Sequence, residues 1–214
     1  MLHKETVTRD ALEILNDLMQ DKNLDDFFLV GGTALSLQIG HRLSIDLDMF
    51  SLKPFDEKLI LQYLETNKKY KSGFEARNTL KGKISDVQID FITHSYPLID
   101  KIQNFNGLRI AGLKDIAAMK LNAIAGNGTR LKDFIDIAYL STNLSLVTMV
   151  ESYETKYSSR NPVSALKSLA YHKDINFNEP IHLLHGTFSW NIIEKRLNQM
   201  IKSPDKVFPE FAIN

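Results

Sequence analysis

The stretch FLVGGTALSLQIGHRLSIDLDMFS, residues 28–51, decides the fold. It begins within a short apolar run, residues 27–30, which is typical of a buried strand. Gly31 and Gly32 follow, and residues 33–39 predict a short helix. Because glycine has no Cβ and a helix N-terminus presents free N–H groups, this turn is a candidate phosphate site. A Gly-Gly pair after a strand is also common as a simple turn.

Two carboxylates lie on the next predicted strand. Over residues 45–50, apolar side chains alternate with Asp46 and Asp48, so the period of two places both carboxylates on one face. Adjacent carboxylates repel each other unless a cation lies between them, and Mg²⁺ prefers such oxygen ligands together with substrate phosphates. Asp46 and Asp48 are therefore candidate metal ligands and catalytic residues, although a bare Asp-x-Asp could also lie on a solvated strand edge.

A third carboxylate lies on a further predicted strand. Val87, Ile89 and Phe91 alternate with polar residues, and Asp90 faces away from the apolar set. Asp90 is a candidate third metal ligand if its strand lies beside that of Asp48. The alternative is an exposed strand residue, because the order of strands does not follow from the sequence.

The rest of the chain predicts an α+β fold. A small mixed sheet flanked by helices is expected in residues 1–112, and a helical lobe in residues 113–214. Helices are predicted over residues 12–19, 59–64, 113–125 and 129–140, strands over residues 70–80, and short helices after residue 140, one with Trp190 as a core anchor.

Composition excludes several classes of protein. Lys and Arg total 26, as do Asp and Glu, so the net charge is zero and RNA binding would need a local basic patch. The 214 residues contain no cysteine, which excludes disulfides and thiolate catalysis. The chain has no membrane-length apolar stretch, so we expect a cytoplasmic protein without membrane contact.

The motifs resemble those of a known family. A glycine pair, a short helix and Asp-x-Asp are met by Gly31, Gly32, Asp46 and Asp48, and the pattern Gly-His-Arg-x-Ser-x-Asp-Leu-Asp-x-Phe is met over residues 40–50. This combination resembles the AbiEii/AbiGii-type nucleotidyltransferase toxins, a branch of the polymerase-beta-like nucleotidyltransferase superfamily. The segments LKDIAAMKLNAIA, residues 113–125, and RLKDFIDIAYL, residues 130–140, are also similar to this branch.

The resemblance implies a fold and an activity. It implies a nucleotidyltransferase fold and a Mg²⁺-dependent enzyme that moves a nucleoside monophosphate from an NTP to an acceptor. It further implies a toxin of a toxin–antitoxin or phage-defence system, with tRNA as the acceptor and an antitoxin protein as a partner. Two alternatives stay open: a small-molecule nucleotidyltransferase, for example one acting on an aminoglycoside, and a nucleotide-binding regulatory protein without turnover.

The helical lobe contributes two more catalytic candidates. Lys120 lies near the middle of the apolar arc of its predicted helix, where an ammonium group is costly unless it reaches an anion such as a phosphate. Most lysines are simply solvated. The resemblance favours Asp136 as a functional carboxylate, with Asp133 second. From spacing alone, Asp136 could form a surface pair with Lys132, and Asp133 could stabilise the helix N-terminus.

Further residues are candidates for nucleotide binding. Thr33 opens the helix after the glycine turn, and His41 and Arg42 follow that helix. Their alternative role is a cation pair at the helix C-terminus. Ser44 lies two residues before Asp46 and could orient a carboxylate. With Gly31, Gly32 and Lys132, these residues complete the predicted nucleotide-binding set.

Overall fold

The computed structural model describes residues 1–209, and they form two compact units. The first unit comprises Met1–Gly40, Ser44–Pro97 and Lys101–Ala111. The second comprises His41–Leu43, Leu98–Asp100 and the chain from Gly112 onward. Compared with the expected boundary between residues 112 and 113, two short segments of the N-terminal part therefore belong to the second unit.

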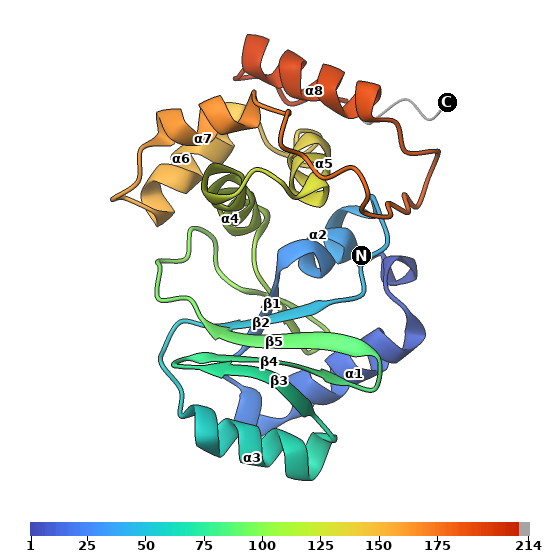
Figure 1. Ribbon diagram of the computed structural model, residues 1–214, viewed down its shortest axis with the longest axis vertical. Coiled ribbons are helices and arrows are strands. Elements are labelled where there is room, and N and C mark those ends of the chain that lie inside the picture. The colour runs from blue at the N-terminus through green and yellow to red at the C-terminus, as the bar shows by residue number, and fades with distance from the viewer. Residues whose placement is uncertain (210–214) are drawn as a thin grey trace. The chain divides into compact units, whose positions relative to one another are not determined.

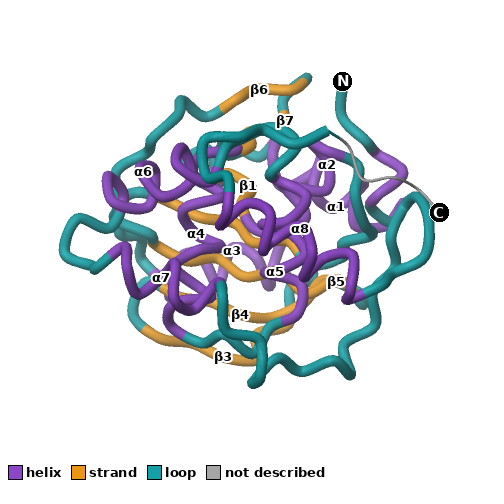
Figure 2. The backbone as a smooth tube through the Cα atoms, turned by 90° about the horizontal axis from the view of Figure 1, so that it is seen from above, coloured by secondary structure: helices purple, strands orange, loops and turns teal. Residues whose placement is uncertain are grey.

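The first unit is built on a mixed sheet of seven strands, in the order β3–β4–β5–β2–β1–β7–β6. Figure 2 shows the strands side by side, from β6 to β3. The pairs β2–β5 and β1–β7 are parallel, and the other neighbours are antiparallel. The expected α+β fold with a mixed sheet and helices is confirmed. The strands are β1 (Phe28–Val30), β2 (Leu47–Ser51), β3 (Lys71–Ala76), β4 (Thr79–Ile84), β5 (Val87–Thr93), β6 (Gln103–Phe105) and β7 (Leu108–Ile110).

One face of this sheet forms the core of the first unit. Alternate side chains of β2 and β5 point to it and are fully buried, among them Met49 and Phe91. Helices α1 (Arg9–Gln20) and α3 (Glu57–Lys68) lie on this side, and α2 (Gly31–Ile39) lies on the other (Figure 1). The Thr8 hydroxyl caps α1 by accepting from the backbone N–H of Ala11. Polar side chains of β2 and β5 consequently face the side of α2.

Two boundaries near the glycine turn differ from the sequence prediction. Helix α2 begins at Gly31 instead of residue 33. Strand β2 begins at Leu47, so the prediction of a strand from residue 45 is wrong for its first two residues. Ile45, expected to be part of the apolar face, is 53% exposed, and Asp46 lies in the loop before the strand. The alternation of residues 45–50 therefore predicts a strand that begins two residues too early.

A short hairpin was not predicted. Strands β6 and β7 pair through a turn at Asn106 and Gly107, whose φ angles are 53° and 93°. An Asn-Gly pair is the common sequence of such a two-residue turn, since both positions need positive φ. The sequence analysis assigned no element between Pro97 and the helix predicted from residue 113, which is where this hairpin lies.

The second unit is helical, as expected for the C-terminal part. Asp115 explains why residues 98–100 belong to it: its carboxylate accepts from the backbone N–H groups of Ile99 and Asp100 and pairs with Lys156 at 2.8 Å. Trp190 is half-buried and contacts the rings of Phe134, His172 and Phe177. The helices are α4 (Leu113–Gly126), α5 (Leu131–Leu140), α6 (Leu146–Lys156), α7 (Pro162–Leu169) and α8 (Trp190–Lys202).

Among the helices of residues 1–209, none is both long and apolar enough to cross a membrane.

Candidate active site

The glycine turn lies directly against a carboxylate. In the antiparallel pair β1–β2, Val30 is opposite Asp48, and Gly31 follows Val30 with a φ of 72°. A Cβ on Gly31 would lie 2.0 Å from Asp48 Oδ2. Both the positive φ and the close approach require glycine at this position. The glycine turn and the Asp48 carboxylate are thus in direct contact.

Two carboxylates lie side by side on the sheet. Asp48 of β2 and Asp90 of β5 are register partners in a parallel pair, and partners in register point to the same face. Lys81 Nζ lies 2.9 Å from Asp90 Oδ2, and Gln88 Nε2 donates to Asp90 Oδ1 at 3.1 Å. The Asp90 side chain is 15% exposed, so the alternative of an exposed strand residue is wrong.

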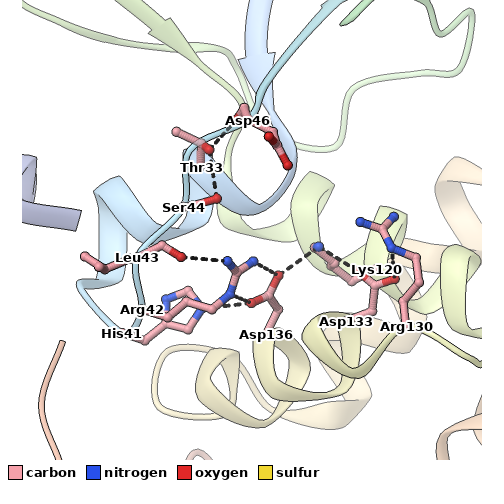
Figure 3. Close-up of polar contacts among 10 residues, drawn as sticks. All are labelled: Thr33, His41, Arg42, Leu43, Ser44, Asp46, Lys120, Arg130, Asp133 and Asp136. Carbon is pink, nitrogen blue, oxygen red and sulfur yellow. Dashed lines mark hydrogen bonds and ion pairs between the residues drawn. The ribbon is translucent and has the colours of Figure 1, made fainter. Parts of the chain in front are cut away.

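Asp46 occupies the loop that leads into β2. The Thr33 hydroxyl donates to the Asp46 backbone oxygen and lies 2.9 Å from Ser44 Oγ (Figure 3). These contacts fix the backbone immediately before the strand, while the Asp46 residue itself is exposed. Ser44 thus contacts a hydroxyl of α2.

Three aspartates of the first unit are the candidate ligands of a hard cation. Asp46, Asp48 and Asp90 offer carboxylate oxygens, which Mg²⁺ prefers. The glycine at position 31 leaves open the space against Asp48 Oδ2 that a Cβ would fill. Within residues 1–209, no three His, Cys, Asp or Glu side chains are grouped closely enough to hold a metal ion. The assignment of a metal to these aspartates therefore stays a prediction.

A buried cluster of charges lies within the second unit. Arg42 donates to Asp136 through two nitrogens, Nε at 2.7 Å and Nη2 at 2.9 Å, which is the bidentate geometry of the strongest ion pairs (Figure 3). His41 Nε2 lies 2.9 Å from Asp136 Oδ1, and Lys120 Nζ lies 2.8 Å from Asp136 Oδ2. Lys120 also pairs with Asp133 at 2.7 Å. All five side chains are buried.

The pKa directions follow from this arrangement. Burial alone would raise the pKa of Asp136, but Arg42, Lys120 and the His41 hydrogen bond hold it well below its ordinary value. Burial would lower the pKa values of Arg42 and Lys120, yet the carboxylates raise both. Burial lowers the pKa of His41 against the opposing effect of Asp136. The neutral His41 therefore donates from Nε2 to the carboxylate, and its Nδ1 is buried without a hydrogen-bond partner.

This geometry decides between several alternatives. Asp136 is fully buried with Arg42 and Lys120, so a surface pair with Lys132 is wrong. Asp133 pairs with Lys120, so it does more than stabilise a helix end. His41 and Arg42 bind a carboxylate rather than only a helix terminus. Lys132 is half-buried on α5. Whether Lys120 and Asp136 take part in the reaction stays a prediction.

Lys81 is the residue of this site that sequence reasoning missed. A two-residue turn, Ser85 and Asp86, joins β4 to β5, and the register that it sets places Lys81 opposite Asp90. Recognising the hairpin in residues 79–92 would have identified this lysine.

Comparison with known proteins finds a family match that includes the glycine turn and two of the candidate carboxylates. A family model described as "Nucleotidyl transferase AbiEii toxin, Type IV TA system" matches residues 13–87, which include the glycine turn, Asp46 and Asp48. The uncharacterised protein aq_aa25 of Aquifex aeolicus (strain VF5) is 35% identical over 172 residues, which is 78% of this chain and 83% of that protein.

Two solved structures share the fold. A putative nucleotidyltransferase from H. pylori has a TM-score of 0.56 and 18% identity, over 92% of this chain and 96% of that chain. MenT4, a nucleotidyltransferase toxin from Mycobacterium tuberculosis H37Rv, has a TM-score of 0.57 and 14% identity, over 90% of this chain and 80% of that chain.

Proposed function

We propose, since this chain belongs to the AbiEii nucleotidyl transferase toxin family, that it moves a nucleoside monophosphate from an NTP to a hydroxyl of an RNA acceptor with the help of Mg²⁺. The chain is a nucleotidyltransferase. Its family is that of a toxin in a type IV toxin–antitoxin system, which implies an NTP substrate and an antitoxin partner. We further propose that the acceptor is tRNA and that the protein acts in the cytoplasm.

The contact between Gly31 and Asp48 carries this proposal. A phosphate that binds to the N–H groups at the start of α2 would lie beside the Asp48 carboxylate, because the two positions are separated by less than a side chain. Asp90 is the next residue along the same row of the sheet. The backbone N–H groups that would bind a triphosphate and the carboxylates that would hold its metal ion are thus adjacent on the first unit.

The roles of the residues follow from their chemistry. Gly31 and Gly32 bind phosphate through backbone N–H groups, and Thr33 and Ser44 fix the loop that carries Asp46. Asp46, Asp48 and Asp90 would hold Mg²⁺, which when bound neutralises charge on the triphosphate and lowers the pKa of the acceptor hydroxyl. The acceptor oxygen bonds to the α-phosphorus, the bond to the pyrophosphate oxygen breaks, and the hydroxyl proton passes to solvent.

Asp136 has a positioning role in this scheme. Both oxygens of Asp136 are engaged by Arg42 and Lys120, so we assign Asp136 to holding residues 41–43 in place. These residues join the helix of the glycine turn to the strand of the carboxylates. Lys120 and Lys132 remain candidates for phosphate contact.

A transfer assay with labelled substrates tests the proposal. The protein is incubated with Mg²⁺ and each α-³²P-labelled NTP, together with total RNA, with small-molecule acceptors including aminoglycosides, or with neither. We expect label in RNA, and Asp46→Asn or Asp48→Asn should each reduce the transfer at least about 100-fold, because charge stabilisation of the transition state is lost.

Asp26→Asn is the matched control, since Asp26 is exposed and lies outside the site. Label on a small molecule would favour the small-molecule enzyme, and NTP binding without transfer would favour the regulatory protein. Full activity in both the Asp46 and the Asp48 variants would refute the metal assignment.

A further inference from the structure

A single row of side chains crosses five strands of the sheet. The registers place Val30 opposite Asp48, Asp48 opposite Asp90, Asp90 opposite Lys81, and Lys81 opposite Phe74. Neighbouring strands are about 4.8 Å apart, so Phe74 lies about 10 Å from Asp90 along the row. The glycine turn is at one end of this row, the carboxylates are in the middle, and Lys81 and Phe74 are at the other end.

The end beyond Asp90 is open and basic. Phe74 is 53% exposed and the Lys81 side chain is 45% exposed. Lys83 lies two residues from Lys81 on β4, on the same face, and is opposite Lys71 of β3. Lys71 and Lys83 are both exposed. These residues lie on the antiparallel pair of β3 and β4, and we call Lys71, Phe74, Lys81 and Lys83 the hairpin face.

The chain segment that carries this face departs from the charge balance of the whole chain, although Lys68 at its start is paired with Asp17 and Asp21. The chain has no net charge, but residues 68–84 contain one acidic residue, Glu75, and six basic residues: Lys68, Lys69, Lys71, Arg77, Lys81 and Lys83. Like charges directly opposite each other on a sheet are destabilising, and Lys71 and Lys83 are such a pair. The stability of the fold therefore does not account for these lysines, whereas a polyanionic ligand does.

In-line transfer determines on which side of the carboxylates the acceptor lies. The attacking and leaving oxygens lie on opposite sides of the phosphorus. If the pyrophosphate lies at the glycine turn, the acceptor hydroxyl reaches Asp48 and Asp90 from the side of Lys81. We propose that the hairpin face binds a single-stranded segment of an RNA acceptor, its lysines contacting phosphates and Phe74 stacking on a base. This inference rests on the proposed function, and the basic face disfavours a cationic acceptor such as an aminoglycoside.

Binding of a labelled oligonucleotide tests the role of the lysines. The affinity of a short 5′-fluorescein single-stranded oligoribonucleotide is measured by anisotropy across a salt series. Each phosphate contact on a single strand contributes about 0.7 to the salt slope, or about fivefold in affinity at about 0.1 M salt. Lys71→Gln/Lys83→Gln should therefore lower the slope by about 1.4 and the affinity about 25-fold. Lys22→Gln/Lys58→Gln, a pair of exposed lysines elsewhere, should change neither.

Phe74 is tested separately because stacking does not depend on salt. Phe74→Ala should weaken binding about 5- to 150-fold with an unchanged salt slope, and Phe74→Tyr should bind like the wild type, since it keeps the aromatic ring. In transfer assays, the variants of the hairpin face should raise the KM for RNA and leave the KM for the NTP unchanged. A purely structural role would not produce this division.

The outcomes separate the inference from the proposed function. Unchanged RNA affinity and salt slope in the double lysine variant and in Phe74→Ala, in a protein that transfers nucleotides to RNA, would overturn the inference and leave the function standing. If the wild-type protein transfers no nucleotide but binds RNA through the hairpin face, the result would support the RNA-binding surface and refute the proposed function.

Discussion

The ion pair between Arg42 and Asp136 gives the sharpest quantitative prediction. We expect Asp136→Leu and Arg42→Met to destabilise the protein strongly as single changes, and the double variant to be more stable than Asp136→Leu alone. The reason is that Asp136→Leu leaves a buried guanidinium without its carboxylate, whereas the double variant removes both charges. In every variant Lys120 keeps its pair with Asp133.

The magnitude follows from distances and burial. Asp136 has contacts of 2.7–2.9 Å with two cations, and each attraction amounts to about 6 kcal/mol at an effective dielectric constant of about 20. Desolvation of the charges opposes most of it, so removing one partner costs about 3–5 kcal/mol. Arg42→Met should cost less than Asp136→Leu, because Asp136 then keeps Lys120 and His41. The coupling between the two changes should be at least about 2 kcal/mol.

Urea denaturation at pH 7 measures these differences, because urea does not screen charge as a salt does. Trp190 is the single tryptophan of the chain and belongs to the second unit, so its fluorescence follows the unit that contains the pair. The exposed pair Arg9 and Glu13, changed to Met and Leu, is the control and should show no measurable coupling. Additive losses for Arg42 and Asp136, or losses under about 1 kcal/mol, would refute the reasoning.

Two further predictions concern the turn and His41. Gly31→Ala should abolish transfer, because its Cβ would displace the Asp48 carboxylate. The control is Gly107→Ala, which has a similar positive φ but no atom within 4 Å of the added Cβ; it should lose about 1–2 kcal/mol of stability and keep its activity. Equal activities of the two variants would refute the steric argument. Burial lowers the pKa of His41 from 6.5, so below about pH 6.5 the unfolded chain binds a proton that the folded chain does not. The free energy of unfolding should fall by up to about 2 kcal/mol between about pH 7 and pH 5, and His41→Gln, which keeps a donor for Asp136 but does not titrate, should lack this part of the fall.

Local patterns predicted the strands around the glycine turn and the aspartates, but not the β6–β7 hairpin. The apolar run before Gly31 gives β1, and the alternation around Asp48 and Asp90 gives β2 and β5. These features depend on residues that are neighbours in the sequence, so a single chain is sufficient to find them. The error at Ile45 arose because period-two alternation continues into a loop that is fixed by the Thr33 hydroxyl.

Contacts between distant residues could not be predicted in the same way. Two partners of Asp136, Arg42 and His41, are 94 and 95 residues away in the sequence, and the spacing of Asp136 from Lys132 suggested a surface pair instead. The position of Asp48 beside Asp90 depends on a parallel pairing that no turn specifies. Lys81 is different, because its register with Asp90 is set by a two-residue turn and was available from the sequence.

Lys120 and Lys81 differ in exposure, and this difference determines which of them can bind a substrate anion. Lys120 is 9% exposed and contacts two carboxylates, so an NTP phosphate would have to replace at least one of these ion pairs to bind it. Lys81 is 45% exposed and contacts one carboxylate, so an incoming anion can be bound with little loss of contacts within the protein. Breaking a buried pair costs several kcal/mol, whereas a partly exposed pair contributes about 1 kcal/mol or less. Of the two lysines, Lys81 is therefore the one that the structure leaves available for a substrate, and Lys120 is the one whose loss should first be detected in the stability of the second unit.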